Sequence, residues 1–293
     1  MTVVSYLRLN NKSGIGCADE RESHQEGRFY DMAKKLSPIG NSALISYAGP
    51  ISYGEEMIDK VKKNVKSDAG ITQIAEFVGN KYLEIVTKKF QKMIFDKFGV
   101  SEEEYKFKNL DDKLRENITK ILHDPWNYNY SLPNIIFGGY DKNEDDFKIY
   151  LIGYPGSTNK HLRYLSIGSG NDIAGFIIGN YLQKMKQEER ENIAKYKGAR
   201  ILMEATRFAW LNVGVGGESQ LVCIDEKGLD ELGSKESNLL NNLLYCEERN
   251  NLNKEYVDSM FKKIIEEGVK STDVKEEVES KTGYKNLDSC LLY

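Results

Sequence analysis

The stretch TVVSYLRLNNKSGIGCAD, residues 2–19, carries the clearest structural signal in the sequence. Residues 3–9 are rich in β-branched and apolar side chains, and residues 10–14 (NNKSG) are typical of a turn. Residues 15–19 then return as a second short strand. The stretch therefore predicts a β-hairpin at the beginning of the fold.

Hydrophobic periodicity predicts further strands and helices along the rest of the chain. Strands are expected over residues 43–48, 134–140, 147–153, 163–167 and 220–225. Helices are expected over residues 55–66, 71–98, 189–211 and 254–268, and from a cap at Asn171 or Asp172 onward. Runs of strands followed by runs of helices indicate an α+β fold rather than a doubly wound parallel sheet. Two sheets stacked between helical layers would bury all the apolar faces.

Charge and composition argue against several classes of protein. The chain has 293 residues, with 41 basic and 45 acidic side chains and a formal charge of -4. A general nucleic-acid binder usually presents a basic face or tail, which this balance does not suggest. No apolar run approaches the length of a membrane-spanning helix, and the opening MTVVSYLR lacks the layout of a secretory signal. We therefore expect neither nucleic acid nor membrane among its partners.

Cysteines and histidines are scattered along the sequence, at Cys17, Cys223, Cys246, Cys290, His24, His123 and His161. The absence of paired cysteine spacing argues against disulfides or structural zinc and favours a reducing, cytoplasmic location. No local motif supports Ser-His-Asp or Cys-His catalysis. The run GVGG at 214–217 follows a predicted helix and precedes a strand, which is the wrong order for a dinucleotide fingerprint. We expect no cofactor and no metal.

Thr2 follows the initiator Met1 and is small enough for an aminopeptidase to remove that methionine. Removal would leave a free amine and a hydroxyl on one residue. A hydroxyl is a weak nucleophile until a base takes its proton, and an α-amine with a pKa near about 8 can act as that base at neutral pH. A threonine here also occurs without any catalytic purpose, so Thr2 alone does not decide the function.

Three further residues strengthen the catalytic interpretation of Thr2. Asp19 ends the returning strand of the hairpin, so it would lie beside the beginning of the chain. Lys35 could neutralise Asp19 and lower the proton affinity of the Thr2 hydroxyl through its charge. Gly49 ends the next strand, where a backbone N–H could face a developing oxyanion. The structural alternatives are a turn salt bridge between Asp19 and Arg21, a solvated Lys35 and a turn-forming Gly49.

Five segments together resemble the signature segments of proteasome β-type subunits, which belong to the N-terminal-nucleophile hydrolase superfamily. They are ADER (18–21), KKL (34–36), LISYAG (44–49), IGSG (167–170) and VGG (215–217). The resemblance covers about residues 2–228. It implies a four-layer αββα sandwich and acyl transfer. In this reaction a hydroxyl attacks a peptide carbonyl, and the resulting ester passes to water or to another amine.

The resemblance also implies residue roles. It implies the nucleophile at Thr2, the charged pair that activates it at Asp19 and Lys35, the oxyanion-hole amide at Gly49, the serine that orients the terminal amine at Ser169, and a basic residue that supports the aspartate at Arg21.

This chain departs from the family pattern in three ways. Thr2 lies one residue farther from Asp19 than the family spacing, which one extra residue in the first turn would absorb. Asn212 and Val215 replace an aspartate and a serine of the family, so that amine orientation is expected to be weaker or to use other groups. A retained Met1 would leave Thr2 without its base.

Two segments make this chain longer than a compact β-type subunit. One is an insertion at about residues 95–130, whose aromatic run WNYNY (126–130) we expect in an ordered loop. The other is an extension over 229–293, beyond a hydrolase domain over 1–228, and its helix over 254–268 would pack on its own domain or on a neighbour. Ring-forming relatives imply a homo-oligomer. Relatives called connectases join peptides, so hydrolysis and ligation both stay open.

The leading hypothesis is a proteasome-like threonine protease or acyl-transferase that acts on peptide or protein substrates. The alternative is a catalytically inactive homologue that serves as a scaffold or assembly subunit, which Met1, Asn212 and Val215 motivate. A small-molecule amidase of the same superfamily is a third hypothesis, because a fold does not fix a substrate.

Overall fold

The computed structural model describes residues 2–23, 29–31, 34–65, 69–107, 110–123, 132–153, 156–161, 163–212 and 215–282. The aromatic run 126–130, expected in an ordered loop, lies outside these residues. Met1 lies outside them as well.

A five-stranded antiparallel sheet contains the predicted hairpin, with its strands in the order β10-β1-β2-β11-β12. The strands are β1 (Val4–Arg8), β2 (Gly14–Asp19), β10 (Tyr164–Ile167), β11 (Ser219–Asp225) and β12 (Gly228–Glu231). In this register Val4 pairs with Ala18 on one side and with Ile167 on the other. The residues just before β1 therefore lie beside those just after β2 and β10.

The second sheet is also antiparallel and has the strand order β5-β6-β7-β8-β9. Its strands are β5 (Ser37–Ile39), β6 (Ala43–Ala48), β7 (Asn134–Asp141), β8 (Asp146–Gly153) and β9 (Ser157–His161). Ala48 pairs with Asn134, so Gly49 follows β6 at the end of the sheet where β7 begins. Two short strands, β3 (Arg21–Ser23) and β4 (Phe29–Asp31), pair separately.

The two sheets face each other across an apolar core that both supply. Tyr6 of β1 is fully buried in this core, and its hydroxyl forms a hydrogen bond of 3.0 Å with the Ser46 hydroxyl of β6. A side chain at Gly138 would approach the Tyr6 ring to 2.8 Å, so the glycine makes room for that ring. This packing fixes the position of one sheet relative to the other.

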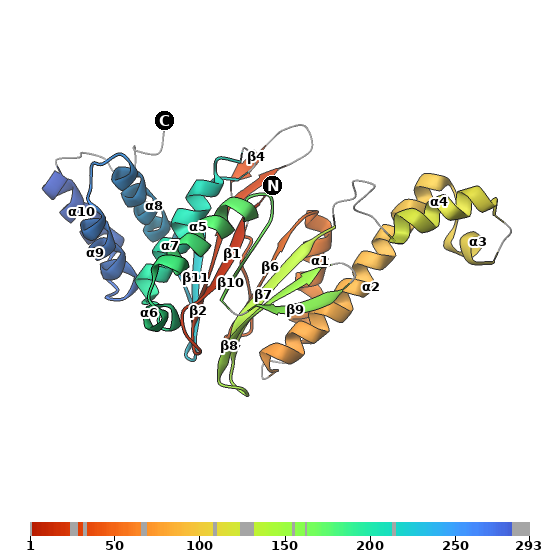
Figure 1. Ribbon diagram of the computed structural model, residues 1–293, viewed down its shortest axis with the longest axis horizontal. Coiled ribbons are helices and arrows are strands. Elements are labelled where there is room, and N and C mark those ends of the chain that lie inside the picture. Colours follow the sequence, from red (N-terminus) through yellow and green to blue (C-terminus); the bar gives the residue numbers. More distant parts are fainter. Residues whose placement is uncertain are drawn as a thin grey trace.

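Helices cover the outer faces of both sheets (Figure 1). Those on the first sheet's side are α5 (Asn171–Lys184), α6 (Gln187–Glu191), α7 (Lys195–Ala209), α8 (Ser234–Glu248), α9 (Lys254–Ile265) and α10 (Ser271–Thr282). On the second sheet lie α1 (Ile51–Asn64) and α2 (Ile71–Phe98), and α2 continues outward to α3 (Glu102–Phe107) and α4 (Asp112–His123). No described helix meets the length and hydropathy of a bilayer-spanning segment.

The mixed α+β class is confirmed, with two antiparallel sheets and helices. Strand β6 and helix α2 have the expected bounds, whereas α1 begins at Ile51, earlier than expected. The single helix over 189–211 is wrong. It is interrupted where the buried Ile193 donates its N–H to the carbonyl of Leu9 at 3.0 Å, and this tie to the first sheet separates α6 from α7.

The expected cap of α5 at Asn171 or Asp172 is also wrong. Gly170 is the N-cap residue and makes no side-chain cap bond. Its N–H donates to the carbonyl of Thr2 at 3.3 Å, and a Cβ there would lie 2.9 Å from that of Ala209. The close approach of Thr2 and α7 therefore determines how α5 begins.

Candidate active site

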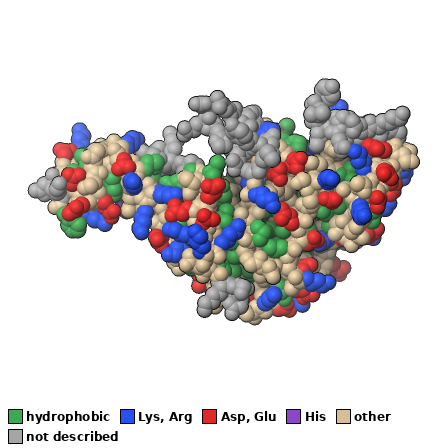
Figure 2. Space-filling model, turned by 180° about the vertical axis from the view of Figure 1, so that it is seen from behind, with side chains coloured by type: hydrophobic (Ala, Val, Ile, Leu, Met, Phe, Trp, Pro, Cys, Tyr) green, Lys and Arg blue, Asp and Glu red, His purple; other side chains and the backbone are tan. Residues whose placement is uncertain are grey.

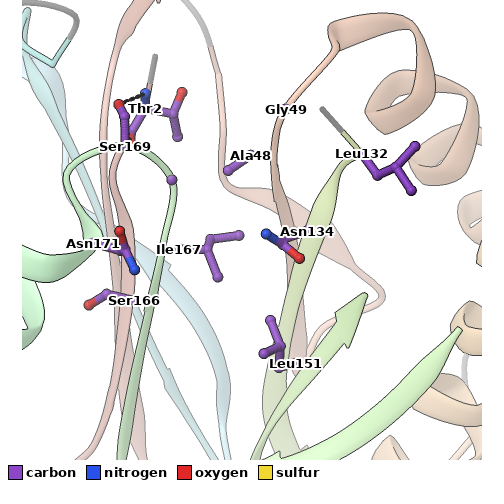
Figure 3. A pocket seen from close by; sticks show the side chains of 11 residues that line it. Thr2, Ala48, Gly49, Leu132, Asn134, Leu151, Ser166, Ile167, Ser169 and Asn171 are labelled. Carbon is purple, nitrogen blue, oxygen red and sulfur yellow. Dashed lines mark hydrogen bonds between the residues drawn. The ribbon is translucent and has the colours of Figure 1, made fainter. Parts of the chain in front are cut away.

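Thr2 lies just before β1, beside the turn that joins β10 to α5. Its main-chain nitrogen donates to the Ser169 hydroxyl at 3.2 Å, the bond drawn in Figure 3. Its carbonyl accepts a bond from the same hydroxyl at 3.4 Å. Among the described residues, none forms a hydrogen bond with the Thr2 hydroxyl, so this group is available for chemistry.

The turn around Thr2 depends on Gly168. This residue has a φ of 97°, a backbone conformation that L side chains rarely adopt, and a Cβ here would lie 2.1 Å from the Thr2 carbonyl oxygen. From the other side, the Asn212 amide donates to the Ser169 carbonyl at 2.9 Å. Asn212 thus holds the serine that contacts Thr2, although it carries no charge.

Asp19 and Lys35 form a buried ion pair that contacts the residue after Thr2. The Lys35 ammonium donates to the Asp19 carboxylate at 2.8 Å and to the Arg21 carbonyl at 2.6 Å. The Asp19 side chain is fully buried, and the Lys35 side chain is 7% exposed. The carboxylate also accepts the Val3 N–H at 2.8 Å, so it holds the residue that follows Thr2.

The charge of Asp19 is balanced by several neighbours. Burial raises the pKa of the Asp19 carboxyl above its ordinary value, and the Lys35 ammonium limits that rise. Hydrogen bonds from the N–H groups of Val3 and Gly216 also lower the pKa of Asp19. The Gly216 N–H donates to the carboxylate at 3.2 Å. With three donors around it, the carboxylate is satisfied where it lies.

Gly49 follows β6 on the second sheet, across the cleft from Ser169 (Figure 3). Its φ is 129°, and a Cβ would lie 2.8 Å from the Cα of Pro133, so only glycine fits here without strain. No described residue accepts a hydrogen bond from its N–H. Such a group is free to bind an anionic oxygen.

A cleft of about 560 Å³ connects these groups. It runs from Thr2 down between the ends of the two sheets (Figure 3). The described residues that line it are Thr2, Ala48, Gly49, Leu132, Asn134, Leu151, Ser166, Ile167, Gly168, Ser169 and Asn171. The cleft is large enough to admit a few amino-acid side chains beside the threonine hydroxyl.

The fold therefore brings the residues chosen from the sequence to one place, in two layers. Thr2, Gly49 and Ser169 line the cleft, while Asp19 and Lys35 are buried and do not line it. Arg21 contributes its carbonyl to Lys35, and its guanidinium lies against Gly216, where an added Cβ would meet it at 2.7 Å. Val215 is buried among apolar side chains, as its lack of a polar group suggests.

Sequence reasoning missed Gln220 and Asn134. The Gln220 amide oxygen accepts the N–H groups of Lys35 at 2.7 Å and of Leu36 at 3.2 Å, and so fixes the backbone that carries the lysine. A polar residue at the beginning of an otherwise apolar strand was the available signal. Asn134 lines the cleft at the first position of β7, where the sequence gives no such signal.

No cluster of three or more His, Cys, Asp or Glu suited to a metal ion occurs within the described ranges. Comparison with known proteins gives no family model and no curated protein that matches this chain.

Proposed function

We propose that this protein is an N-terminal threonine hydrolase or acyl-transferase of the proteasome type, which acts on peptide bonds through an ester on Thr2. One observation carries the proposal. The nitrogen of Thr2 is held by Ser169, and the next N–H along the chain is held by Asp19, which pairs with Lys35. The nitrogen and hydroxyl of Thr2 thus lie one residue from a backbone N–H that the buried pair of Asp19 and Lys35 holds.

The chemistry follows from these positions once Met1 has been removed. The free amine of Thr2 takes the proton of its own hydroxyl, whose oxygen attacks the substrate carbonyl. The Gly49 N–H faces the carbonyl oxygen as it becomes negative. The C–N bond then breaks, and the leaving amine takes the proton from the Thr2 ammonium. Water or another amine attacks the ester, which releases the product and restores the hydroxyl.

The architecture supports the same proposal. Two antiparallel sheets with helices on both outer faces are compatible with the four-layer αββα sandwich that the proteasome resemblance implies. The hairpin and the turn after β10 meet at Thr2, so the nucleophile lies where the two sheets open. A fold alone does not fix a reaction, which is why the proposal depends on the contacts of Thr2.

Labelling with a β-lactone, which acylates a reactive hydroxyl, tests the proposal. Wild-type protein and a Thr2→Ser variant should gain the mass of the lactone, and Thr2→Ala should gain none. Thr272→Ala removes an exposed threonine hydroxyl on α10 and is the matched control that should label like wild type. Equal labelling of Thr2→Ala and wild type would remove Thr2 from the mechanism.

The competing proposal is a non-catalytic scaffold or assembly subunit. The observation in its favour is that Met1 precedes Thr2 in the sequence, and a retained methionine would leave the Thr2 nitrogen in a peptide bond. Intact-mass spectrometry of protein from its native cell decides between the two. Loss of the methionine supports the enzyme, because only a free amine can act as the base. Complete retention supports the scaffold.

A further inference from the structure

The described residues that line the cleft below Thr2 have no charged side chain. None of the eleven described lining residues is acidic, basic or a histidine, although charged residues make up 29% of the chain. The nearest ion pair, Asp19 with Lys35, does not line the cleft, and the lysine ammonium already donates to Asp19 and to the Arg21 carbonyl. A charged ligand group entering the cleft would lose water without gaining a described counter-charge.

The position of the base indicates which part of the substrate, the carbonyl side or the amine side, binds in this cleft. In the proposed function, on which this inference rests, the Thr2 amine hands its proton to the leaving amine. That amine must therefore depart next to the Thr2 nitrogen, and an incoming amine must attack from the same place. Ser169 accepts from that nitrogen and, with Gly168 and Ile167, continues directly into the wall of the cleft. Gly49 lies on the opposite wall, suited to the carbonyl oxygen.

Four of the strand residues that line the cleft, from both sheets, form what we call the inter-sheet subsite: Ala48, Asn134, Leu151 and Ile167. Figure 3 shows Asn134 and Ile167 pointing toward one another across it, with Leu151 below. Ala48 and Ile167 are buried, and Leu151 is half-buried. The described residues supply no hydrogen bond to the Asn134 amide, so this group has a donor and an acceptor to offer a ligand.

We infer that the inter-sheet subsite binds the side chain of the residue that carries the leaving or incoming amine, and that it selects uncharged side chains. Asn134 is its specificity-determining residue. Leu151 and Ile167 favour an aliphatic chain of leucine size, and the Asn134 amide also accommodates a polar, uncharged end such as that of glutamine. Aspartate and lysine side chains are excluded because none of the described lining residues has a charged side chain to compensate their charge.

The selection of side chains can be measured from how the acetyl group on Thr2 divides between water and an added amine. p-Nitrophenyl acetate supplies the acetyl group, and the amides of alanine, leucine, glutamine, lysine and aspartate (the α-amide) serve as amine acceptors. Each acceptor attacks the Thr2 ester and forms an N-acetyl amide, which competes with release of acetate to water. Mass spectrometry gives the ratio of the two products, with Thr2→Ala as the blank. We expect leucine and glutamine amides to be used about ten-fold or more better than those of lysine and aspartate.

Asn134→Asp changes the subsite from neutral to anionic with almost no change in shape. The ratio of lysine to leucine product should rise about ten-fold, because the new carboxylate lies where the lysine ammonium would enter. Asn251→Asp adds the same charge at an exposed position between α8 and α9, and it should leave every ratio unchanged. An equal rise in both variants would show an effect of net charge and overturn the inference.

A second variant keeps the test independent of Asn134. Leu151→Phe fills the floor of the subsite, so the ratio of leucine to alanine product should fall while acetylation of Thr2 continues. Equal use of all five amides by wild-type protein would overturn the inference and leave the acyl chemistry standing. Absence of any Thr2-dependent acetylation would instead remove the proposed function, and the inference with it.

Discussion

At the scale of single residues, Gly168 determines where Thr2 lies. Gly168→Ala would place a Cβ 2.1 Å from the Thr2 carbonyl oxygen at a φ of 97°. The backbone conformation alone costs about 1–2 kcal/mol for a residue with a side chain. We expect β-lactone labelling of Thr2 to fall by about a hundred-fold, since a displacement near 1 Å has an effect of that size on a positioned reaction.

Gly175 provides the matched control for this substitution. It lies within α5, where an added Cβ meets no atom within 4 Å. Gly175→Ala should label normally and raise the free energy of unfolding by about 0.5–1 kcal/mol, because alanine loses less backbone entropy in a helix. Normal labelling of Gly168→Ala would contradict the tight contact.

The ion pair of Asp19 and Lys35 makes a prediction about pH. Lys35→Met leaves the buried carboxylate with only its N–H donors, and loss of a single partner from a buried pair costs about 3–5 kcal/mol. Burial already raises the pKa of Asp19, and Lys35 opposes that rise, so the variant's pKa is higher still. An acid whose pKa is raised on folding stabilises the fold below its ordinary pKa, and this stability is lost as the pH rises through the raised value.

Urea unfolding at two pH values measures the effect. The free energy of unfolding should differ less between wild type and Lys35→Met near pH 4 than at pH 8, because only at the higher pH must the variant bury an unpaired anion. Lys34→Met is the control, since Lys34 is exposed and pairs with Glu231 at the surface. A difference that does not vary with pH would mean that Asp19 is not the titrating group.

At the scale of elements, Arg200 of α7 joins three helices. Its guanidinium donates to Glu247 of α8 at 2.5 Å and to Asp258 of α9 at 2.9 Å, and its side chain is only 5% exposed. Arg200→Met should weaken the attachment of α8 and α9, with a cost of about 3–5 kcal/mol for the carboxylates left behind. Hydrogen exchange should accelerate in α8 and α9 more than in β1 and β2. Lys263→Met removes an exposed pair with Glu277 and should change exchange little.

Elements with an uninterrupted apolar period could be predicted from the sequence, and the others could not. The apolar residues of α2 recur from Ile71 to Phe98 without a break, and its bounds were predicted. Strand β9, STNKH, is polar and at a sheet edge, so no alternation marks it. Helix α8 buries Asn241 and Asn242, which hides its periodicity. The division between α6 and α7 depends on the long-range bond from Ile193 to Leu9.

The candidate site also contains residues that could be predicted from the sequence and residues that could not. Asp19, Lys35, Gly49 and Ser169 could be chosen because each belongs to a short segment that resembles one family, and Thr2 could be chosen because it follows Met1. Their convergence depends on β10 pairing with β1, about 160 residues apart in the chain, which no local pattern reveals. The roles of Gln220 and Asn134 depend on the direction in which their side chains point. That direction is determined by the register of β11 and β7, which the sequence does not reveal.

At the scale of the whole molecule, the cleft exists because the two sheets diverge at one end. Thr2 and Ser169 belong to the first sheet's end and Gly49 to the second's. The distance between the proposed nucleophile and the proposed oxyanion site therefore depends on how the sheets pack. Tyr6 and Ser46 join the sheets inside the core. Any change that shifts one sheet relative to the other should therefore affect the chemistry before it affects the fold.

The helices after residue 228 belong to the same core as α7 in the described structure. Leu240 and Leu243 of α8, and Val257 and Phe261 of α9, are buried together with side chains of α7 and the first sheet. Burial of each such side chain stabilises a fold by about 1.5–3 kcal/mol, and the net stability of a domain is only about 5–15 kcal/mol. A chain that ends after residue 228 also loses most of β12, which pairs with β11.

We therefore expect the chain cut after residue 228 to lack a cooperative thermal transition and to show no labelling of Thr2, because α7 and β11 would expose the apolar side chains that α8 and α9 cover. Circular dichroism during heating, together with β-lactone labelling, measures both properties. A chain cut after residue 282 keeps every described element and should melt and label like the full chain. Cooperative melting and normal labelling after the shorter cut would mean that residues 2–228 fold by themselves and that the later helices serve another purpose.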